Sequence, residues 1–301
     1  MDKRITGVVP IVLTPLKKNG DIDTQSCERL VDYLIENGAA ALFALGSASE
    51  GYLLDNKQRL EAVSAFAKAA RKRVPLIVGC SHLSPRNVFE FLKQIKTIGV
   101  DGVHYIPEDL KLGDDRLVHL VKSYAEKSPV PLYLYHNTKR GKKITLKVVK
   151  ALKPHPNIRG IKVGGYDREE MKAFLEVEDD GFQILGSGGG QFLDWLQLGA
   201  SAVTASSACC FPILFQKIYN EYLNGDLLAA EEHQTKWNEF HSAIPNTASE
   251  NGEYAAEEKY VLRQLGVIKE DHCHFPLRSL SAMEKQQVNF ALKKYCKLLY
   301  S

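Results

Sequence analysis

Long hydrophobic runs are absent from this sequence. No uninterrupted apolar stretch in the 301 residues approaches the ~20 residues that a membrane-spanning helix needs, so we expect no membrane partner. The first ten residues, MDKRITGVVP, carry charge but no apolar core before the first proline, and we therefore expect no secretory signal peptide. These absences favour a location in the cytoplasm.

Charge of one sign and patterned cysteines are also scarce. Lys and Arg number 39 against 36 Asp and Glu, an excess too small to indicate nucleic acid as a partner. The six cysteines show no C-x-x-C spacing, so they indicate neither a zinc site nor a disulfide framework, which fits a reducing compartment. His272 and His274 stand two apart, which is not a helical ligand spacing, and we interpret them as a surface turn.

Two nucleotide-binding signatures are missing as well. No G-x-G-x-x-G stretch opens the first expected helix, which counts against a dinucleotide-binding open sheet. The glycine triplet at residues 188–190 lacks the terminal Lys-Ser/Thr of a phosphate-binding loop. The composition, 45% hydrophobic and 25% charged, is nevertheless that of a globular protein, so the alternation of apolar and polar residues can be interpreted as secondary structure.

Short apolar runs alternate with longer amphipathic runs through the first two-thirds of the chain. The short runs suit buried strands, and the longer ones have the apolar spacing of helices. The expected strands are residues 7–15, 40–46, 75–80, 101–106, 130–136, 158–163, 182–186 and 201–206. The helices that follow them are expected at residues 23–38, 55–73, 84–99, 114–128, 145–154, 167–177, 190–199 and 212–225.

Helix-end signals support these boundaries. Asp55 is a suitable N-cap for the second helix, and Ser84 followed by Pro85 is a suitable start of the third. A weak repeat also recurs in NGAAALFALG, IGVDGVHYIP and LGASAVTASS, where a glycine separates a helix from the next strand. We expect each of these glycines to end its helix in a left-handed turn.

Eight strand–helix units in succession predict a closed (β/α)8 barrel. The alternation indicates a parallel sheet with helices outside it, and eight units in roughly 220 residues fit a closed barrel better than an open sheet. We assign residues 1–224 to this barrel as the catalytic domain. After Asn224 the pattern becomes purely helical, and we expect residues 225–301 to form a helical appendage packed on the barrel.

The stretch NIRGIKVGGYD places one lysine near the end of the sixth expected strand. Active sites of such barrels lie at the C-terminal ends of the strands, so the amine of Lys162 would point into the barrel mouth. Partial burial would lower the pKa of its ammonium group, and a neutral amine can attack a ketone to form a Schiff base. Glycines at 160, 164 and 165 would leave room for a substrate. From position alone, a lysine that extends from a strand end to water is the more common alternative.

Other polar residues at strand ends suit the same chemistry. Tyr135 could donate and accept the proton that a carbonyl condensation requires. Tyr133 has the same side-chain parity, so only nearness to the strand end favours Tyr135, and either could be an aromatic residue of the core. The turn GSASEG offers backbone N–H groups and the hydroxyls of Ser47 and Ser49 to a carboxylate, or it is an ordinary turn that Glu50 braces.

The run KRGKK at residues 139–143 follows the fifth expected strand. Such a charged run is usually a solvated face. Because it lies directly after Tyr135, it could instead receive an anionic substrate. Arg140 suits that role best because its planar guanidinium matches a carboxylate.

Four stretches together carry a resemblance to a known family. VPIVLTPLKKNGDID, GSASEGYLL, YLYHNTKR and GIKVGG resemble the dihydrodipicolinate synthase / N-acetylneuraminate lyase family, from Thr6 to Ala208. Members of this family are class I (Schiff-base) aldolases on a (β/α)8 barrel with added C-terminal helices. The spacing from Tyr135 to Lys162, combined with the G-S/T-x-x-E turn, makes the resemblance fairly specific.

The resemblance implies a role for each matching residue. Lys162 would form an imine with pyruvate or another 2-keto acid, and Tyr135 would relay protons. Ser47, with the neighbouring amide of Ala48, would hold the carboxylate of the keto acid. No metal or organic cofactor is implied, because the iminium is itself the electron sink, and the family implies a homo-oligomer, a tetramer or a dimer.

Further site residues follow from the resemblance and from its departures. Arg140 falls where the synthase branch places an arginine for the second substrate's carboxylate, and we include Gly186 and Thr204 among the substrate-binding residues. Glu108 and Asp109 stand where the family usually has aromatic residues that supply a tyrosine to a neighbouring subunit. We expect these two acids to form an altered proton relay or to contact a polar substrate.

Two more departures affect the expected substrate. Ala48 and Ser49 replace the second hydroxyl and the glycine of the family's turn, and GSGGGQ lacks the acidic residues that hold sugar hydroxyls in the sialic acid branch. The prediction is therefore a dihydrodipicolinate synthase-like lyase that condenses a 2-keto acid with an aldehyde or cleaves the product. The alternatives are an N-acetylneuraminate lyase, a 2-keto-3-deoxy sugar-acid aldolase or dehydratase, and a keto-acid-binding homologue with impaired turnover.

Overall fold

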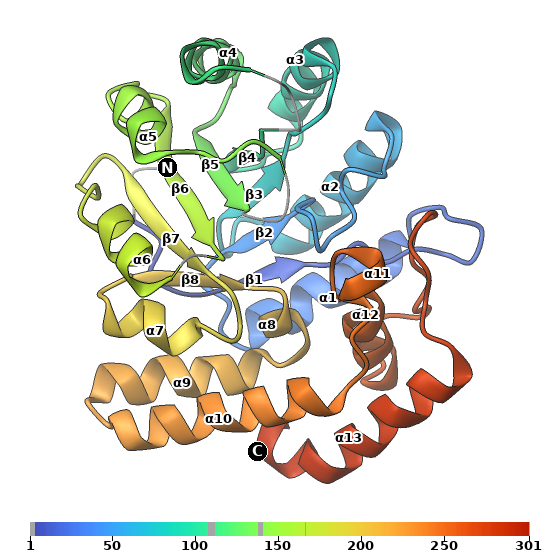
Figure 1. The fold of residues 1–301 in the computed structure, drawn as a ribbon. Coiled ribbons are helices and arrows are strands. Elements are labelled where there is room, and N and C mark those ends of the chain that lie inside the picture. The colour runs from blue at the N-terminus through green and yellow to red at the C-terminus, as the bar shows by residue number, and fades with distance from the viewer. Residues whose placement is uncertain (1–3, 108–111, 138–140, 166, 301) are drawn as a thin grey trace.

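Parallel strands closed into a barrel form the centre of the molecule (Figure 1). The computed structural model describes residues 4–107, 112–137, 141–165 and 167–300. Within these residues eight strands pair in chain order, and the last pairs with the first. The strands are β1 (Gly7–Val12), β2 (Leu42–Ala44), β3 (Leu76–Gly79), β4 (Gly102–Tyr105), β5 (Leu132–Asn137), β6 (Ile158–Gly164), β7 (Gln183–Ser187) and β8 (Ala202–Ala205). The predicted (β/α)8 barrel is confirmed.

Helices surround the barrel and continue beyond it. Those within and directly after the strand–helix units are α1 (Thr24–Glu36), α2 (Asn56–Ala70), α3 (Pro85–Gln94), the 3₁₀-helix η1 (Ile95–Thr97), α4 (Asp114–Lys127), α5 (Leu146–Leu152), α6 (Arg168–Leu175), α7 (Phe192–Gln197), α8 (Ser207–Cys210) and α9 (Pro212–Asn224). The C-terminal helices are α10 (Leu227–Ala243), α11 (Ala248–Asn251), α12 (Ala255–Gln264) and α13 (Ala282–Tyr300). The short helices α8 and α11 were not expected from the sequence.

The predicted helix starts are found, with one difference. Asp55 caps α2 in a reciprocal capping box: its carboxylate accepts from the Gln58 amide at 2.8 Å, and the Gln58 side chain accepts from the Asp55 amide at 3.2 Å. Ser84 precedes α3 with Pro85 in the first turn, but the Ser84 side chain makes no capping hydrogen bond. The fixed φ of proline therefore starts α3 without help from a hydroxyl.

The repeated glycines end helices as expected. Gly38, Gly99 and Gly199 have φ values of +88°, +87° and +98°, in the left-handed region. Each residue directs the chain from a helix or its last turn into β2, β4 or β8. A side chain at these positions would be strained, which explains why the same residue recurs in the sequence repeat.

Strand parity separates two cores. Alternate residues face the outer helices or the inside of the barrel, and the interior apolar cluster consists of Ile5, Val9, Ala41, Phe43, Ile77, Ile106, Tyr133, Tyr135, Leu185 and Ala202. On β6, Ile161 and Val163 belong to the outer core. Lys162 lies between them in sequence and therefore faces the interior, where only 1% of its surface is exposed.

The C-terminal helices reach the barrel at the end of β8. α12 packs against α8, which directly follows β8 and also packs against β1 (Figure 1). α9 and α10 lie side by side, and α13 packs against both. The extension therefore approaches the C-terminal ends of the strands, where the site of a (β/α)8 barrel is found.

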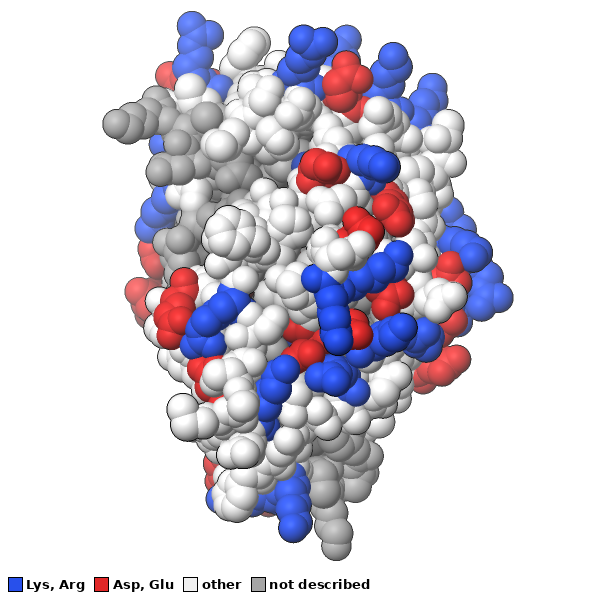
Figure 2. Space-filling view, turned by 90° about the vertical axis from the view of Figure 1, so that its right-hand side faces the viewer, with Lys and Arg blue, Asp and Glu red and all other residues white. Residues whose placement is uncertain are grey.

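Surface charges of both signs are interspersed on the face drawn in Figure 2. Two ion pairs connect α1 with α2 and with the turn that follows α2: Lys68 donates to Glu28 at 2.7 Å, and Arg73 pairs with Asp32. Among the described residues, no helix is both long enough and apolar enough to cross a membrane.

The cysteines of the described chain are buried free thiols. They are Cys27, Cys80, Cys209, Cys210 and Cys273. Among the described residues no group of three or more His, Cys, Asp or Glu side chains is arranged to hold a metal ion.

Close approach of β7 and α7 requires glycine at position 186, and we predict that Gly186→Ala destabilises the fold. A Cβ at this position would lie 2.6 Å from the Trp195 ring, and Trp195 is fully buried. We expect overpacking to lower the free energy of unfolding by about 1–3 kcal/mol, measured by urea denaturation. Gly190→Ala is the control, because the nearest atom to a Cβ there is 3.9 Å away. Equal stability of the two variants would contradict this packing role.

Candidate active site

A cavity of about 260 Å³ opens at the C-terminal ends of the strands. This volume is slightly below the about 300–1,000 Å³ of pockets for drug-sized ligands, so it suits a small metabolite. Strands β1, β5 and β6, the turn after β2, the segments after β7 and β8, and the C-terminal extension all contribute to its wall. Its polar lining side chains include Tyr135, Lys162, Ser187, Gln191, Ser206 and Glu253.

Lys162 holds its amine inside the barrel, against aromatic rings. Its Nζ lies 3.5 Å from the ring centroid of Tyr135 and 5.2 Å from that of Phe43. Burial lowers the pKa of Lys162 from 10.5 to about 7, while the negative charge of Glu253 acts in the opposite direction. A substantial fraction of this amine is therefore neutral at neutral pH, which is the form that attacks a carbonyl carbon.

Tyr135 rather than Tyr133 lies at the cavity. Both tyrosines face the barrel interior, as their shared parity predicted. Tyr135 pairs with Lys162 in the β5–β6 register and lines the cavity, whereas Tyr133 pairs with Gly160 deeper in the barrel and does not line it. Burial raises the pKa of Tyr133 to about 12, so its phenol stays protonated. Gly164 and Gly165 line the cavity, as expected for glycines that leave room beside the amine.

In the turn after β2, the hydroxyls of Ser47 and Ser49 have different roles. Ser49 donates to the Val12 carbonyl at 2.6 Å and is therefore a structural part of the turn. Ser47 is buried, and its Oγ has no hydrogen-bond partner among the described residues. Ala48 lines the cavity. A buried hydroxyl without a partner fits a group that binds a ligand, such as the carboxylate of a keto acid.

Glu50 connects this turn to the C-terminal extension. It forms an ion pair with Lys259 of α12, and both side chains are completely buried. Glu50 Oε2 also accepts from the His274 amide at 2.5 Å, and Lys259 donates to the His272 carbonyl at 2.9 Å. The extension therefore holds the turn in place, and Glu50 braces it.

His104 is a site-adjacent residue that sequence reasoning missed. It faces the interior from β4, stacks on Phe43 with ring centroids 4.0 Å apart, and contacts the edge of Tyr135. Burial lowers its pKa to about 3, so the ring is neutral, and Nε2 lies 2.9 Å from the Ala44 carbonyl. The histidine in the apolar run DGVHYI was the available signal, because a polar residue with interior parity in a barrel strand needs a reason to be there.

Gly186 and Thr204 do not line the cavity. The Thr204 hydroxyl donates to the Gly186 carbonyl at 3.0 Å, and the α-carbon face of Gly186 is occupied by Trp195. The wall at these two strand ends is formed instead by residues that follow them in the chain, Ser187 after Gly186 and Ala205 and Ser206 after Thr204.

Three predicted site residues lie outside the described residues. They are Glu108 and Asp109, expected as an altered relay, and Arg140, expected to bind a carboxylate. In the described part of the KRGKK run, Lys142 pairs with Asp114 at 3.1 Å and Lys143 with Glu170 at 3.2 Å. These two lysines belong to surface ion pairs.

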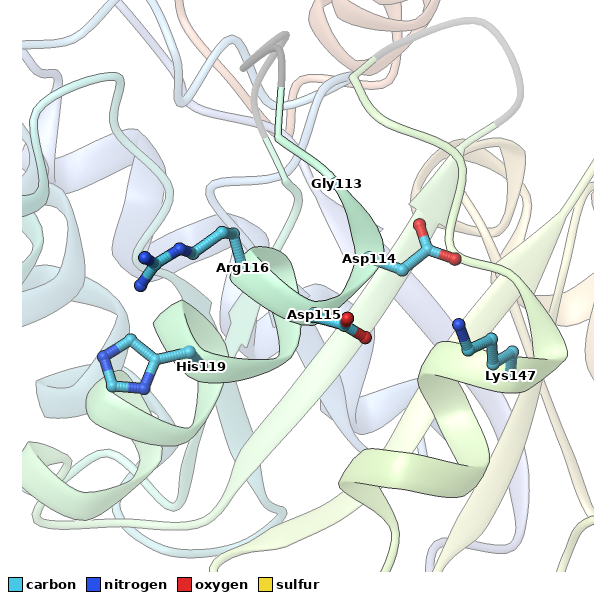
Figure 3. Close-up of a pocket in the computed structure, with 6 residues that line it drawn as sticks. All are labelled: Gly113, Asp114, Asp115, Arg116, His119 and Lys147. Carbon is cyan, nitrogen blue, oxygen red and sulfur yellow. The ribbon is translucent and has the colours of Figure 1, made fainter.

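A second hollow, of about 670 Å³, lies at the first turn of α4 (Figure 3). It is lined by Gly113, Asp114, Asp115, Arg116, His119 and Lys147. In Figure 3 Arg116 and His119 lie on one side, and Asp114 and Lys147 on the other. Charges of both signs line this hollow, without a buried nucleophile, whereas the smaller cavity contains a buried amine. The smaller cavity is therefore the candidate active site.

Known proteins resemble this chain over almost its whole length. The model of the Dihydrodipicolinate synthetase family matches residues 4–295. Among curated proteins, the 4-hydroxy-tetrahydrodipicolinate synthase of Pseudoalteromonas atlantica is 26% identical over 277 residues, which cover 90% of this chain and 92% of that protein.

Solved structures show the same fold. The dihydrodipicolinate synthase of Bacteroides thetaiotaomicron matches with a TM-score of 0.91 at 23% identity, covering 98% of this chain and 100% of that chain. The N-acetylneuraminate lyase of Proteus mirabilis matches with a TM-score of 0.89 at 21% identity, covering 97% and 99%. At these identities the likeness to solved structures concerns the fold.

Removing the buried carboxylate that braces the turn should destabilise the protein strongly. Glu50→Gln leaves the ammonium of Lys259 buried without its partner, and we expect the free energy of unfolding to fall by about 3–5 kcal/mol. Glu28→Gln, which breaks the exposed pair with Lys68, should cost about 0–1 kcal/mol. The double change Glu50→Gln with Lys259→Met should recover part of the loss. Urea denaturation measures all three, and similar effects of Glu50→Gln and Glu28→Gln would refute the assignment.

The buried amine should make stability depend on pH in a defined direction. Between about pH 7 and 10.5 the unfolded chain binds one proton more at Lys162 than the folded chain, so the folded state gains stability as pH rises. Lys162→Met removes this dependence. We expect the variant to be more stable than the wild type, by a margin that shrinks by up to about 1.4 kcal/mol per pH unit across this range. Urea denaturation at several pH values tests this, and a margin independent of pH would contradict it.

Proposed function

This chain belongs to the Dihydrodipicolinate synthetase family, and from that premise we propose that it is a Schiff-base lyase. It joins pyruvate or a related 2-keto acid to an aldehyde, or cleaves the product of that condensation. The observation that carries the proposal is the buried amine of Lys162, which lies against Tyr135 in a small cavity at the strand ends. Family membership and this geometry support the reaction class, and the named relatives supply the candidate substrates.

The first half of the reaction forms the imine. The neutral amine of Lys162 adds to the keto carbon, and the resulting carbinolamine loses its hydroxyl as water to leave a protonated C=N bond. Tyr135 transfers the protons that these steps require, because its side chain lines the same cavity and contacts the amine. The interior of the barrel favours the neutral amine before the reaction by keeping it out of water.

The second half makes or breaks the carbon–carbon bond. The protonated imine draws electrons from the neighbouring carbon, which loses a proton and becomes the nucleophilic end of an enamine. This carbon attacks the aldehyde carbon, the aldehyde oxygen takes up a proton, and water hydrolyses the imine to restore the amine. Cleavage follows the same steps in reverse, and the imine accepts the electron pair in both directions.

The carboxylate of the keto acid needs its own binding group. Ser47 offers a buried hydroxyl without a partner among the described residues, and Ala48, next to it, lines the cavity. We assign the carboxylate to this turn, which Glu50 fixes through Lys259. Holding the carboxylate there would orient the keto carbon toward the amine.

Several predicted properties stay predictions. These are the roles of Arg140, Glu108 and Asp109, the substrate-binding roles of Gly186 and Thr204, the homo-oligomer and the cytoplasmic location. A dehydratase of sugar acids would use the same imine, and mass analysis of products separates loss of water from carbon–carbon cleavage. A homologue with impaired turnover would form the imine with pyruvate but consume no aldehyde.

Borohydride reduction in the presence of pyruvate tests the proposal directly. We expect one reduced pyruvate adduct per chain, located at Lys162 by peptide mapping, with a rate that rises with pH through about 7 because the neutral amine reacts. Lys162→Arg should give no adduct at this position. An unmodified Lys162, or an adduct only at surface lysines, would refute the Schiff-base mechanism.

The two interior tyrosines should behave differently when each loses its hydroxyl. We expect Tyr135→Phe to lower turnover by about 10²–10⁴-fold because the proton relay is lost. The imine with pyruvate should still be trapped. Tyr133→Phe is the matched control, because Tyr133 is also interior but does not line the cavity, and its turnover should stay within a fewfold of wild type. The reverse ranking would remove Tyr135 from the mechanism.

A further inference from the structure

One acidic side chain enters the Lys162 cavity from outside the barrel. Glu253 lies between α11 and α12 in the C-terminal extension, is partly buried, and lines the cavity together with Lys162. Its negative charge acts on the ammonium form of Lys162. The extension therefore contributes directly to the chemistry of the cavity wall, in addition to bracing the turn after β2.

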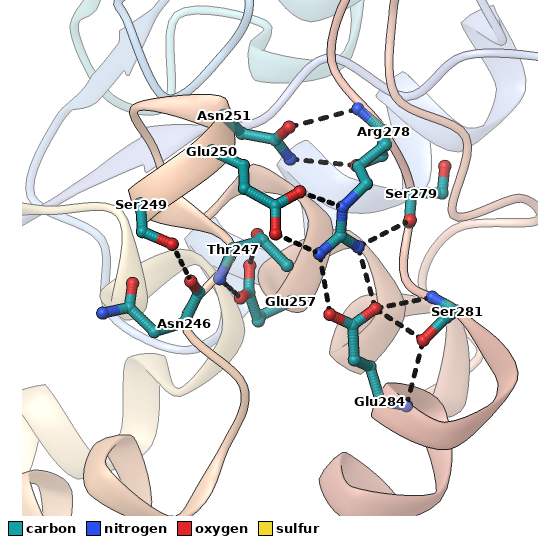
Figure 4. Close-up of polar contacts among 10 residues, drawn as sticks. All are labelled: Asn246, Thr247, Ser249, Glu250, Asn251, Glu257, Arg278, Ser279, Ser281 and Glu284. Carbon is teal, nitrogen blue, oxygen red and sulfur yellow. Dashed lines mark hydrogen bonds and ion pairs between the residues drawn. The ribbon is translucent and has the colours of Figure 1, made fainter.

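The segment on the N-terminal side of Glu253 is held by contacts of Asn251 and Glu250 with Arg278, which Figure 4 shows. The side chain of Asn251 donates to the Arg278 carbonyl at 2.9 Å and accepts from the Arg278 amide at 3.2 Å. The guanidinium of Arg278 in turn bonds Glu250 at 2.5 and 3.0 Å and Glu284 at 2.8 Å. These bidentate ion pairs fix the end of α11, two residues before Glu253.

Hydrogen bonds between Thr247 and α12 hold the segment on the C-terminal side of Glu253. Thr247, which precedes α11, donates from its amide and its hydroxyl to the Glu257 carboxylate of α12, each at 2.6 Å (Figure 4). Lys259, two residues further along α12, is anchored by Glu50. Both ends of the segment that carries Glu253 are therefore tied to fixed elements, which keeps this segment at the cavity wall.

Among the titratable groups around the cavity, Glu253 supplies the negative charge. Glu258 lies behind the wall and is hydrogen-bonded to Ser206, and burial raises the pKa of Glu258 to about 8, so this carboxyl is mainly protonated at neutral pH. Burial also lowers the pKa of His136 to about 4, so that ring is neutral. Among the described lining residues, Glu253 is the acidic side chain and Lys162 the basic one.

We propose that Glu253 determines specificity for the second substrate, admitting an uncharged aldehyde that carries hydroxyl groups and disfavouring an aldehyde that carries its own anion. This proposal rests on the proposed function. The keto acid already brings one carboxylate into a cavity of about 260 Å³, and a second anion near Glu253 would be repelled in a poorly screened environment. Hydroxyl groups would instead donate to Glu253 and bond Gln191 and Ser206 on the same wall.

The proposal and the predicted role of Arg140 favour opposite substrates. Arg140 was expected to bind a carboxylate of the second substrate, whereas Glu253 would repel one. A comparison of one neutral hydroxylated aldehyde with one anionic aldehyde therefore separates the two, whichever natural substrate is used.

The experiment measures kcat/KM with pyruvate plus either glyceraldehyde or succinic semialdehyde. We expect wild type to prefer glyceraldehyde. Glu253→Gln and Glu253→Ala should each lower the ratio of glyceraldehyde to succinic semialdehyde at least tenfold. A change in the basicity of Lys162 affects both aldehydes equally and cancels in the ratio. Glu231→Gln, which removes an exposed carboxylate from α10, is the control and should leave the ratio unchanged.

A second readout covers weak turnover. Each aldehyde is also tested as an inhibitor of trapping with pyruvate by cyanoborohydride, which near neutral pH reduces the iminium but reduces aldehydes only slowly, and the ratio of inhibition constants should change in the same direction. The trapped adduct itself reports whether each variant is folded, and its pH midpoint should move to lower pH in Glu253→Gln because a negative charge near the ammonium is lost.

The outcomes separate this proposal from the proposed function. No adduct in the wild type overturns both. A normal adduct with an unchanged ratio in the two Glu253 variants, or a wild-type preference for succinic semialdehyde, overturns the role of Glu253 and leaves the Schiff-base chemistry standing.

Discussion

Removing the amine of Lys162 from water is the constraint around which the rest of this structure is arranged. A charged amine inside a barrel is unfavourable, and the protein resolves this by letting the amine lose its proton near neutral pH. The aromatic faces of Tyr135 and Phe43 surround the nitrogen without offering a permanent counter-charge of their own. The same desolvation that weakens the fold therefore makes the nitrogen a nucleophile.

The C-terminal extension stabilises the mouth of the barrel. Strands position Lys162 and Tyr135, but the turn that contains Ser47 has no strand register to hold it, and Glu50 at its end is braced by Lys259 of α12. Because this ion pair is wholly buried, losing one partner is far more costly than losing a surface pair. Rigidity at the mouth thus depends on residues more than 200 positions away in the sequence.

Sequence reasoning succeeded where local periodicity determines position. Alternation along a strand predicts which side a residue faces, and the rule that sites lie at strand ends then selects Lys162 and Tyr135. Nearness to the strand end favoured Tyr135 over Tyr133, and the register of β5 against β6 places Tyr135 opposite Lys162 and Tyr133 opposite Gly160. Ser187, Ala205 and Ser206 line the cavity one or two residues beyond the predicted Gly186 and Thr204, and periodicity alone does not give the depth at which a strand reaches the cavity. Glu253 was out of reach, because its place in the cavity depends on how α12 packs on α8.

The loop between α11 and α12 is held on both sides of Glu253. Asn251 is tied to Arg278 and Glu257 to Thr247, on either side of Glu253. A substitution at position 253 would leave Lys162 and Tyr135 in place while altering which aldehyde the cavity accepts. In an evolving lineage or a laboratory library, substitutions in this short segment would change the specificity for the aldehyde without rebuilding the barrel.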